Sequence, residues 1–319
     1  MAQLPEYNEL AEKAKYFRNG DMRIAYNIDG IFTKLEEFYA TGDFIFRCCS
    51  EAKYKLYNSA QRYYITNEIY KQVSSNDIPA HYDNFISDLI VECKGWNNET
   101  VKKLLIKNKI HEENSLAYLS YMQHFGALSP LLDFTFDPYI ALFFAVDNIS
   151  YTPSDNEIDN YFSIYYTYQN ATIFEAWKST FNITAPNLSQ GNIPYSDVNQ
   201  NVMHILLPDN EGYQILNNTN IINQRGLFFY NNSPLQPLEE KYFEFADLVK
   251  QNLGQKMFDH LLMHEQFANC FNIHKSLVPY IKDVLAAKGI TKEYIYPDVY
   301  KMKTAILHNA TVKALRTKK

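Results

Sequence analysis

The chain has little glycine, with ten residues among 319. Loops that cradle phosphates, such as the Walker loop and the GxGxxG fingerprint, need closely spaced glycines because a Cβ would hold the backbone away from the ligand. Neither pattern occurs here, and neither does the HExxH motif of zinc proteases or the GxSxG motif of serine hydrolases. The sequence therefore predicts no glycine-rich phosphate loop, and no motif points to a standard reaction.

Cysteine is also scarce, and none of the four cysteines has the spacing of a metal site. Cys48 and Cys49 are adjacent, so in a strand they point to opposite faces. We expect reduced thiols, as in a cytoplasmic protein. His260 and His264 lie four residues apart on one predicted helical face, but no third ligand is evident, so we predict no metal site.

The chain lacks a long hydrophobic run. No apolar stretch approaches the roughly 18 residues that a membrane span requires, and residues 1–15 lack the basic-then-apolar order of a signal peptide. The formal net charge of −6 disfavours general nucleic-acid binding, which relies on lysine and arginine to neutralise phosphates. We therefore expect a cytoplasmic protein without a membrane or general nucleic-acid partner.

What the chain does have is apolar residues in periodic runs, within a composition that is 46% hydrophobic and 21% charged. The pattern predicts strands over 43–49, 131–135, 161–169, 202–207, 226–230 and 267–273. It predicts helices over 7–17, 31–40, 59–73, 82–110 with a break near 95–98, 115–125, 138–146, 172–181, 237–253, 257–265, 276–288 and 298–312. Residues 184–201 are rich in Asn, Pro and Ser and predict a long loop.

This order predicts an α+β fold, in which a small central mixed or antiparallel sheet is interrupted by long helical insertions. Residues 1–40 are predicted to form an N-terminal helical appendage, and residues 41–319 the α+β domain. One large domain of this kind fits the length of the chain.

Asp133 is the most informative residue of the central block, residues 119–146. It lies inside an apolar strand, where a carboxylate is costly unless it is paired, and strand alternation places it on the same face as Thr135. Asp137 followed by Pro138 predicts a helix N-terminus, and the apolar residues after them predict a buried helix.

Arg47 lies in the middle of another apolar strand and is the counterpart of Asp133. Two interpretations stay open. The two charges form a pair that fixes the core. Alternatively, the guanidinium meets a phosphate or carboxylate of a ligand, because its geometry matches such groups bidentately.

Several ordered blocks resemble the FRG domain family. Phe46-Arg47-Cys48 stands at the place of the family's Phe-Arg-Gly, and the central resemblance comprises 123–126 (QHFG), 131–135 (LLDFT) and 138–146. Blocks at 223–228 and 273–298 continue it. Cys48 replaces the family's glycine, and Pro130 replaces an arginine. The resemblance implies the fold and the position of a site more than an activity, and it suggests a bacterial protein in a defence or toxin setting.

The order of three elements is also similar to that of ADP-ribosyltransferases of the arginine–serine–glutamate type. That similarity implies NAD as cofactor, with Arg47 on the phosphates, Thr135 orienting the site and Gln224 at the position of the glutamate. Glutamine cannot stabilise an oxocarbenium-like transition state as an anion does. Asp133 would supply that charge if it faces the same pocket.

We therefore predict one polar pocket that binds a nucleotide or another anionic small molecule. Its residues are Arg47, Gln123, His124, Asp133, Thr135 and Gln224. Arg47, Asp133, Thr135 and Gln224 are the catalytic candidates, and Arg47, Gln123, His124 and Thr135 the cofactor-binding ones. The alternative is a non-catalytic interaction or sensor module, in which the same residues form a buried polar network.

Overall fold

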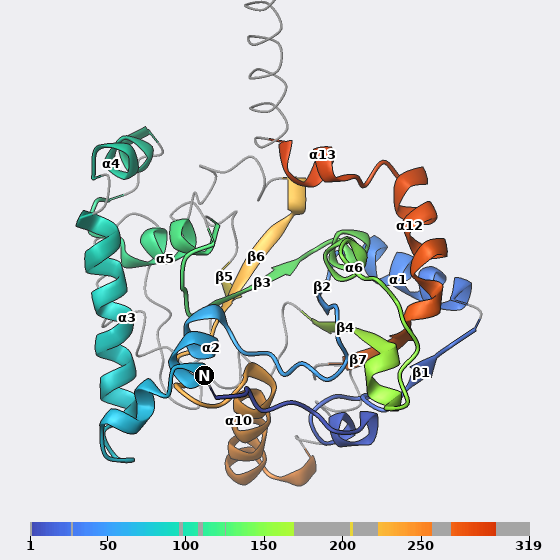
Figure 1. Cartoon of the computed structure of the whole chain (residues 1–319), viewed down its shortest axis with the longest axis horizontal. Helices are drawn as coiled ribbons and strands as arrows, with labels where there is room; N and C mark the ends of the chain where they lie inside the picture. The colour runs from blue at the N-terminus through green and yellow to red at the C-terminus, as the bar shows by residue number, and fades with distance from the viewer. Residues whose placement is uncertain are drawn as a thin grey trace, which may run out of the picture.

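A seven-stranded sheet organises the chain (Figure 1). The computed structural model describes residues 2–26, 28–95, 98–107, 111–124, 126–168, 205–206, 223–256 and 269–297. The strand order is β1-β7-β4-β2-β3-β6-β5. The strands are β1 (Arg23–Ile24), β2 (Phe44–Cys49), β3 (Leu131–Thr135), β4 (Tyr161–Tyr168), β5 (Ile205–Leu206), β6 (Gly226–Tyr230) and β7 (Asn269–His274). β1 pairs in parallel with β7 and the other neighbours pair antiparallel, so the sheet is mixed and the predicted α+β class is confirmed.

Helices separate most of the strands along the chain. They are α1 (Asp29–Thr41), α2 (Ser59–Thr66), α3 (Ile78–Gly95), α4 (Asn98–Lys107), α5 (Ser115–His124), α6 (Pro138–Val146), α10 (Leu238–Leu253), α12 (Val278–Ala287) and α13 (Lys292–Ile295). Short 3-10 helices cover Leu10–Lys15, Ile69–Gln72, Glu157–Asn160 and Lys275–Leu277. The predicted elements 172–181, 184–201, 257–265 and 298–312 fall outside the described residues.

The predicted and observed elements differ at several places. The helix predicted over 59–73 ends at Thr66, because Glu68 takes a left-handed backbone with φ 55°. The helix predicted over 7–17 is a single short 3-10 helix, Leu10–Lys15. Strand β1 and helix α13 were not predicted, and both are too short to carry a hydrophobic period.

The two faces of the sheet have different covers. On one face Ile45, Phe134, Tyr165 and Phe229 pack with the N-terminal segment and α10. The opposite face divides: α1, α6 and α12 cover its β4 and β7 half, and α3 and α5 cover the half that contains β3 and β6. Figure 1 shows these two groups of helices at opposite ends of the sheet. Asp133 therefore points to the face where the helical cover changes from one group to the other.

The segment before residue 41 is part of the same core and does not lie apart as an appendage. Tyr7, Leu10 and Phe17 are buried with side chains of the sheet, and β1 extends the sheet beside β7. Helix α1 was predicted, and it packs against α6. A division at residue 40 therefore cuts through a shared hydrophobic core.

Helix α6 begins as the sequence predicts. The Asp137 carboxylate accepts from the backbone N–H groups of Tyr139 and Ile140, and Pro138 occupies the first turn. Almost every residue of this helix is buried, as an apolar sequence all round requires. Within the described residues, no helix is both long and apolar enough to cross a membrane.

Candidate functional site

Arg47 bridges two strands that are paired at a single position. The β2–β3 register consists of Phe46 opposite Thr135. Beyond that pair, the Arg47 guanidinium donates from Nη1 to the main-chain oxygen of Asp133 at 2.6 Å, and its carbon lies 6.0 Å from the centroid of the Phe134 ring. The side chain thus supplies a hydrogen bond to a carbonyl that the ladder between the two strands leaves unpaired.

The Asp133 carboxylate has a different partner. Its Oδ2 accepts from Gln123 Nε2 at 2.6 Å, so the amide at the end of α5 holds the side chain of β3. Part of Asp133 is exposed, but surrounding protein atoms deprive the carboxylate of solvent and raise its pKa, while the Arg47 charge and the Gln123 hydrogen bond act in the opposite direction. Arg47 therefore reaches Asp133 through the main-chain oxygen, and the predicted ion pair with the carboxylate is not seen among the described residues.

Two buried polar atoms of this cluster have no hydrogen-bond partner within the described part of the chain. They are Arg47 Nε, a donor, and Gln123 Oε1, an acceptor. A buried donor or acceptor without a partner costs about 1–3 kcal/mol, so each one needs an explanation. Here a donor and an acceptor belong to side chains that both reach Asp133, which is an arrangement that a polar ligand can complete.

A second guanidinium belongs to the same cluster. Arg62 of α2 donates from Nη1 to the main-chain oxygen of Tyr57 at 3.0 Å. Its side chain is partly exposed, yet loss of solvent and then the charge of Arg47 lower its pKa, while Asp133 acts in the opposite sense. The cluster therefore holds two guanidinium groups and one carboxylate, and its formal charge is positive.

Sequence reasoning missed Arg62 and also Tyr296. Tyr296 directly follows α13. Burial raises the pKa of its hydroxyl, and the charges of Asp147 and Asp133 add to the increase, so Tyr296 lies near Asp133. Arg62 stands in no motif, and Tyr296 lies in the family-like block 273–298, where nothing marks it as part of the site. Their place becomes visible only once α2 and α13 are packed on the sheet.

Thr135 and Gln224 use their polar groups elsewhere. The Thr135 hydroxyl donates to the main-chain oxygen of Gln224 at 2.7 Å and accepts from the Asp137 N–H at 3.0 Å. The Gln224 amide donates to the main-chain oxygen of Ile295 at 3.2 Å. The structure thus brings Arg47, Gln123 and Asp133 together, while these two residues tie β3, β6 and α13 to one another. The catalytic role predicted for them stays a prediction, and the side chain of His124 lies outside the described residues.

Metal ligands do not gather in the part of the chain that the structure describes, where no group of three His, Cys, Asp or Glu side chains could hold an ion. All four cysteines are free thiols, and burial raises the pKa values of Cys48, Cys93 and Cys270. His260 and His264 lie outside the described residues.

Comparison with known proteins gives one match. Residues 42–153 match the family model of the FRG domain. The matched region contains Arg47, Arg62, Gln123 and Asp133, while Gln224 lies beyond it. No curated protein and no solved structure matches the chain.

Proposed function

Because residues 42–153 of this chain are an FRG domain, we propose that the domain binds the anionic group of a small molecule between Arg47 and Arg62. A nucleotide is the ligand class that fits the cluster best. The observation that carries the proposal is a pair of buried atoms, Arg47 Nε and Gln123 Oε1, that have no hydrogen-bond partner among the described residues. They lie beside two guanidinium groups and one carboxylate.

The charge of the cluster favours an anion. Each of the two guanidinium groups donates one hydrogen bond to a main-chain carbonyl: Arg47 to that of Asp133, and Arg62 to that of Tyr57. Their remaining N–H groups can donate to a phosphate or carboxylate, for which the planar guanidinium is suited. Loss of solvent and then the charge of Arg47 lower the pKa of Arg62, and a bound anion would offset both effects.

The acceptors of the cluster favour a ligand that also carries donors. Gln123 Oε1 and the second oxygen of the Asp133 carboxylate can accept from hydroxyl or amino groups. Inorganic phosphate at neutral pH offers few donors, whereas a nucleotide offers ribose hydroxyls and base amino groups next to its phosphates. This combination supports a nucleotide over a simple anion.

Turnover of NAD is not part of this proposal. An ADP-ribosyltransferase needs an anion beside the developing oxocarbenium ion. The similarity in element order puts Gln224 where those enzymes have the glutamate. Its side-chain amide donates a hydrogen bond to the main-chain oxygen of Ile295. Release of nicotinamide from NAD in the presence of the protein tests this version separately.

The alternative is that the cluster only holds the core together. The hydrogen bond from Arg47 to the Asp133 oxygen favours it, because this bond joins β2 and β3 beyond their single paired position. A structural network predicts a loss of stability on substitution without any effect of ligands.

A thermal-shift comparison tests the proposal. The probes are ADP, ADP-ribose, NAD and pyrophosphate, with uncharged adenosine as the ligand control. A ligand that binds only the native state raises the melting temperature, and we expect a rise of several degrees with at least one phosphorylated probe and none with adenosine.

The matched variants are Arg62→Gln and Arg23→Gln. Arg23 lies on β1 and is paired with Glu157, outside the cluster. We expect Arg62→Gln to abolish the shift and Arg23→Gln to retain it. Absence of a shift with every phosphorylated probe, or a full shift in Arg62→Gln, would overturn the proposal.

A further inference from the structure

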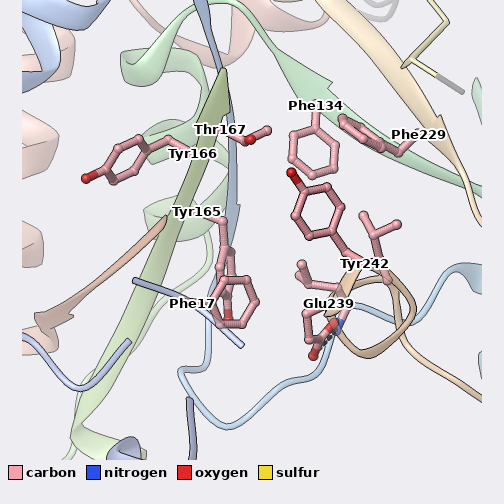
Figure 2. A pocket seen from close by; sticks show the side chains of 10 residues that line it. Phe17, Phe134, Tyr165, Tyr166, Thr167, Phe229, Glu239 and Tyr242 are labelled. Carbon is pink, nitrogen blue, oxygen red and sulfur yellow. Dashed lines mark hydrogen bonds between the residues drawn. The ribbon is translucent and has the colours of Figure 1, made fainter. Parts of the chain in front are cut away.

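A small cavity lies on the sheet face that packs against α10, away from the Asp133 carboxylate. Its volume is about 30 Å³, and it lies between β4, β3, β6 and α10 (Figure 2). Figure 2 shows Tyr242 rising from α10 between the ring of Phe134 and strand β4. Its walls include Phe17, Phe134, Tyr165, Thr167, Phe229, Leu238 and Tyr242.

The accessible wall is almost entirely carbon, although the lining residues Thr167, Glu239 and Tyr242 carry polar groups. Glu239 lines the cavity, but its Oε1 accepts from the Tyr7 hydroxyl at 2.7 Å, and its two oxygens accept from the Leu56 N–H at 3.2 and 3.1 Å. In Figure 2 this carboxylate lies at one end of the group of rings. The charge of Glu239 is therefore directed at protein donors and not at the open space.

The same wall makes the cavity a poor place for water. A cavity of about 30 Å³ has room for roughly two water molecules, but a buried water needs two to four polar partners. Thr167 Oγ1, which is buried without a hydrogen-bond partner in the described part of the chain, is a single polar atom in the wall, and one such partner is too few. An apolar group that enters would gain dispersion contacts with the surrounding rings at no cost in hydrogen bonds.

We propose that this cavity is a binding site for a small uncharged apolar group, of the size of a short hydrocarbon. None of the proposed anion-binding residues Arg47, Arg62, Gln123 and Asp133 lines the cavity. The two sites are neighbours at Phe134, whose ring lines the cavity and has its centroid 6.0 Å from the Arg47 guanidinium carbon. An occupant of the cavity needs neither Arg47 nor Arg62. The inference therefore stands or falls independently of the nucleotide proposal.

Helix α10 forms one side of the cavity. It supplies Leu238, Glu239 and Tyr242 to the cavity. The hydrogen bonds of this helix to the segment at Leu56 lie at its first turn, where the Leu238 N–H donates to the Leu56 oxygen at 3.0 Å and Glu239 accepts from the Leu56 N–H.

Xenon is the probe that tests the site, because it is apolar, uncharged and close in size to the cavity. The experiment follows the ¹²⁹Xe chemical shift against protein concentration for the full chain. Two variants fill the cavity, Leu238→Phe and Thr167→Ile, and circular dichroism establishes that each is folded. We expect saturable binding to the wild type, at least tenfold weaker binding to the filled variants, and unchanged binding to Arg62→Gln.

A third variant enlarges the space and completes the test. Phe229→Leu should bind benzene, which is too large for the wild-type volume, and benzene should raise its melting temperature by several degrees. Equal xenon shifts for the wild type and a folded filled variant would overturn the inference. So would the absence of benzene binding to folded Phe229→Leu.

Discussion

Arg47 uses its guanidinium in two directions. Nη1 is bonded to the Asp133 main-chain oxygen at 2.6 Å, while Nε is buried without a partner in the described part of the chain. A purely structural arginine in a folded core normally satisfies its buried donors. The unpartnered donor is therefore the reason to interpret this residue as part of a binding site and not only as a link between strands.

Glu239 makes a prediction for pH dependence. Burial raises the pKa of its carboxyl to about 7 from an ordinary value of 4.5, although Tyr7 and the Leu56 N–H oppose the shift. The folded state therefore holds a proton that the unfolded state has lost between pH 4.5 and 7, so the free energy of unfolding should fall as pH rises through this window. The full effect is about 3 kcal/mol at most.

Urea denaturation at pH 5, 6, 7 and 8 measures this effect. Glu239→Gln cannot ionise, so its stability should change less over this range than that of the wild type. The matched control is Glu240→Gln, since Glu240 is paired with Lys55 and has no place in the cavity wall. A wild-type stability that rises between pH 5 and 7, or a Glu239→Gln profile parallel to it, would contradict the assignment.

Lys13 makes a second prediction at this scale. Its ammonium is fully buried and donates to the Ala52 oxygen, Ser163 Oγ, the Tyr165 hydroxyl and Asn272 Oδ1, at 2.6 to 3.1 Å. Lys13→Met keeps the length of the side chain but leaves buried acceptors without a donor, and we expect a loss of roughly 2 kcal/mol or more.

Chemical denaturation of Lys13→Met and Lys15→Met provides the comparison. Lys15 is exposed in the same 3-10 helix, so its substitution should change the free energy of unfolding by less than about 1 kcal/mol. Equal stabilities of the two variants would show that the hydrogen bonds of Lys13 add nothing net.

At the scale of elements, the well-predicted segments are those whose signals are local. Strand β3, strand β6 and helix α6 have the predicted bounds, because Pro138 and the Asp137 cap mark the start of α6 and apolar runs define the strands. Gly42 follows α1 with φ 72°, as a predicted helix end requires. The two-residue strand β1 depends on its pairing with β7, and nothing local signals it.

The site could be predicted only in part for the same reason. A charge inside an apolar strand is a local signal, and it identified Arg47 and Asp133. Arg62 and Tyr296 lie where charged and aromatic residues are ordinary, so only tertiary packing places them near Asp133. Arg47 donates its hydrogen bond to the main-chain oxygen of Asp133, and no sequence pattern predicts a main-chain partner.

The cap of α6 gives a prediction at the scale of elements. Asp137→Ala removes the acceptor for the N–H groups of Tyr139 and Ile140 and should destabilise the protein by about 1 kcal/mol. Thermal or urea denaturation measures the loss. Asp155→Ala is the matched control, since Asp155 lies in an exposed bend outside any helix. A loss no larger than that of the control would mean that α6 does not depend on its cap.

For the whole molecule, the structure predicts that the first 40 residues are required for folding. They supply β1, α1, buried Leu10 and Phe17, and the Lys13 hydrogen bonds to β4 and β7. A chain that starts at residue 41 should lack the near-ultraviolet circular dichroism and the cooperative melting of the full chain. A chain that lacks only residues 1–3 is the control and should melt cooperatively. Cooperative melting of residues 41–319 would show an independent domain.

The central claim is that the cluster of Arg47, Arg62, Gln123 and Asp133 binds an anionic ligand. Titration calorimetry of ADP against the wild type and Arg47→Gln, with unliganded melting temperatures for both, tests it most directly. We predict measurable binding by the wild type and a loss of at least tenfold in Arg47→Gln, about 1.4 kcal/mol, by a protein that remains folded. No binding by the wild type, or equal affinity in both proteins, would contradict the claim and leave Arg47 as a structural link between β2 and β3.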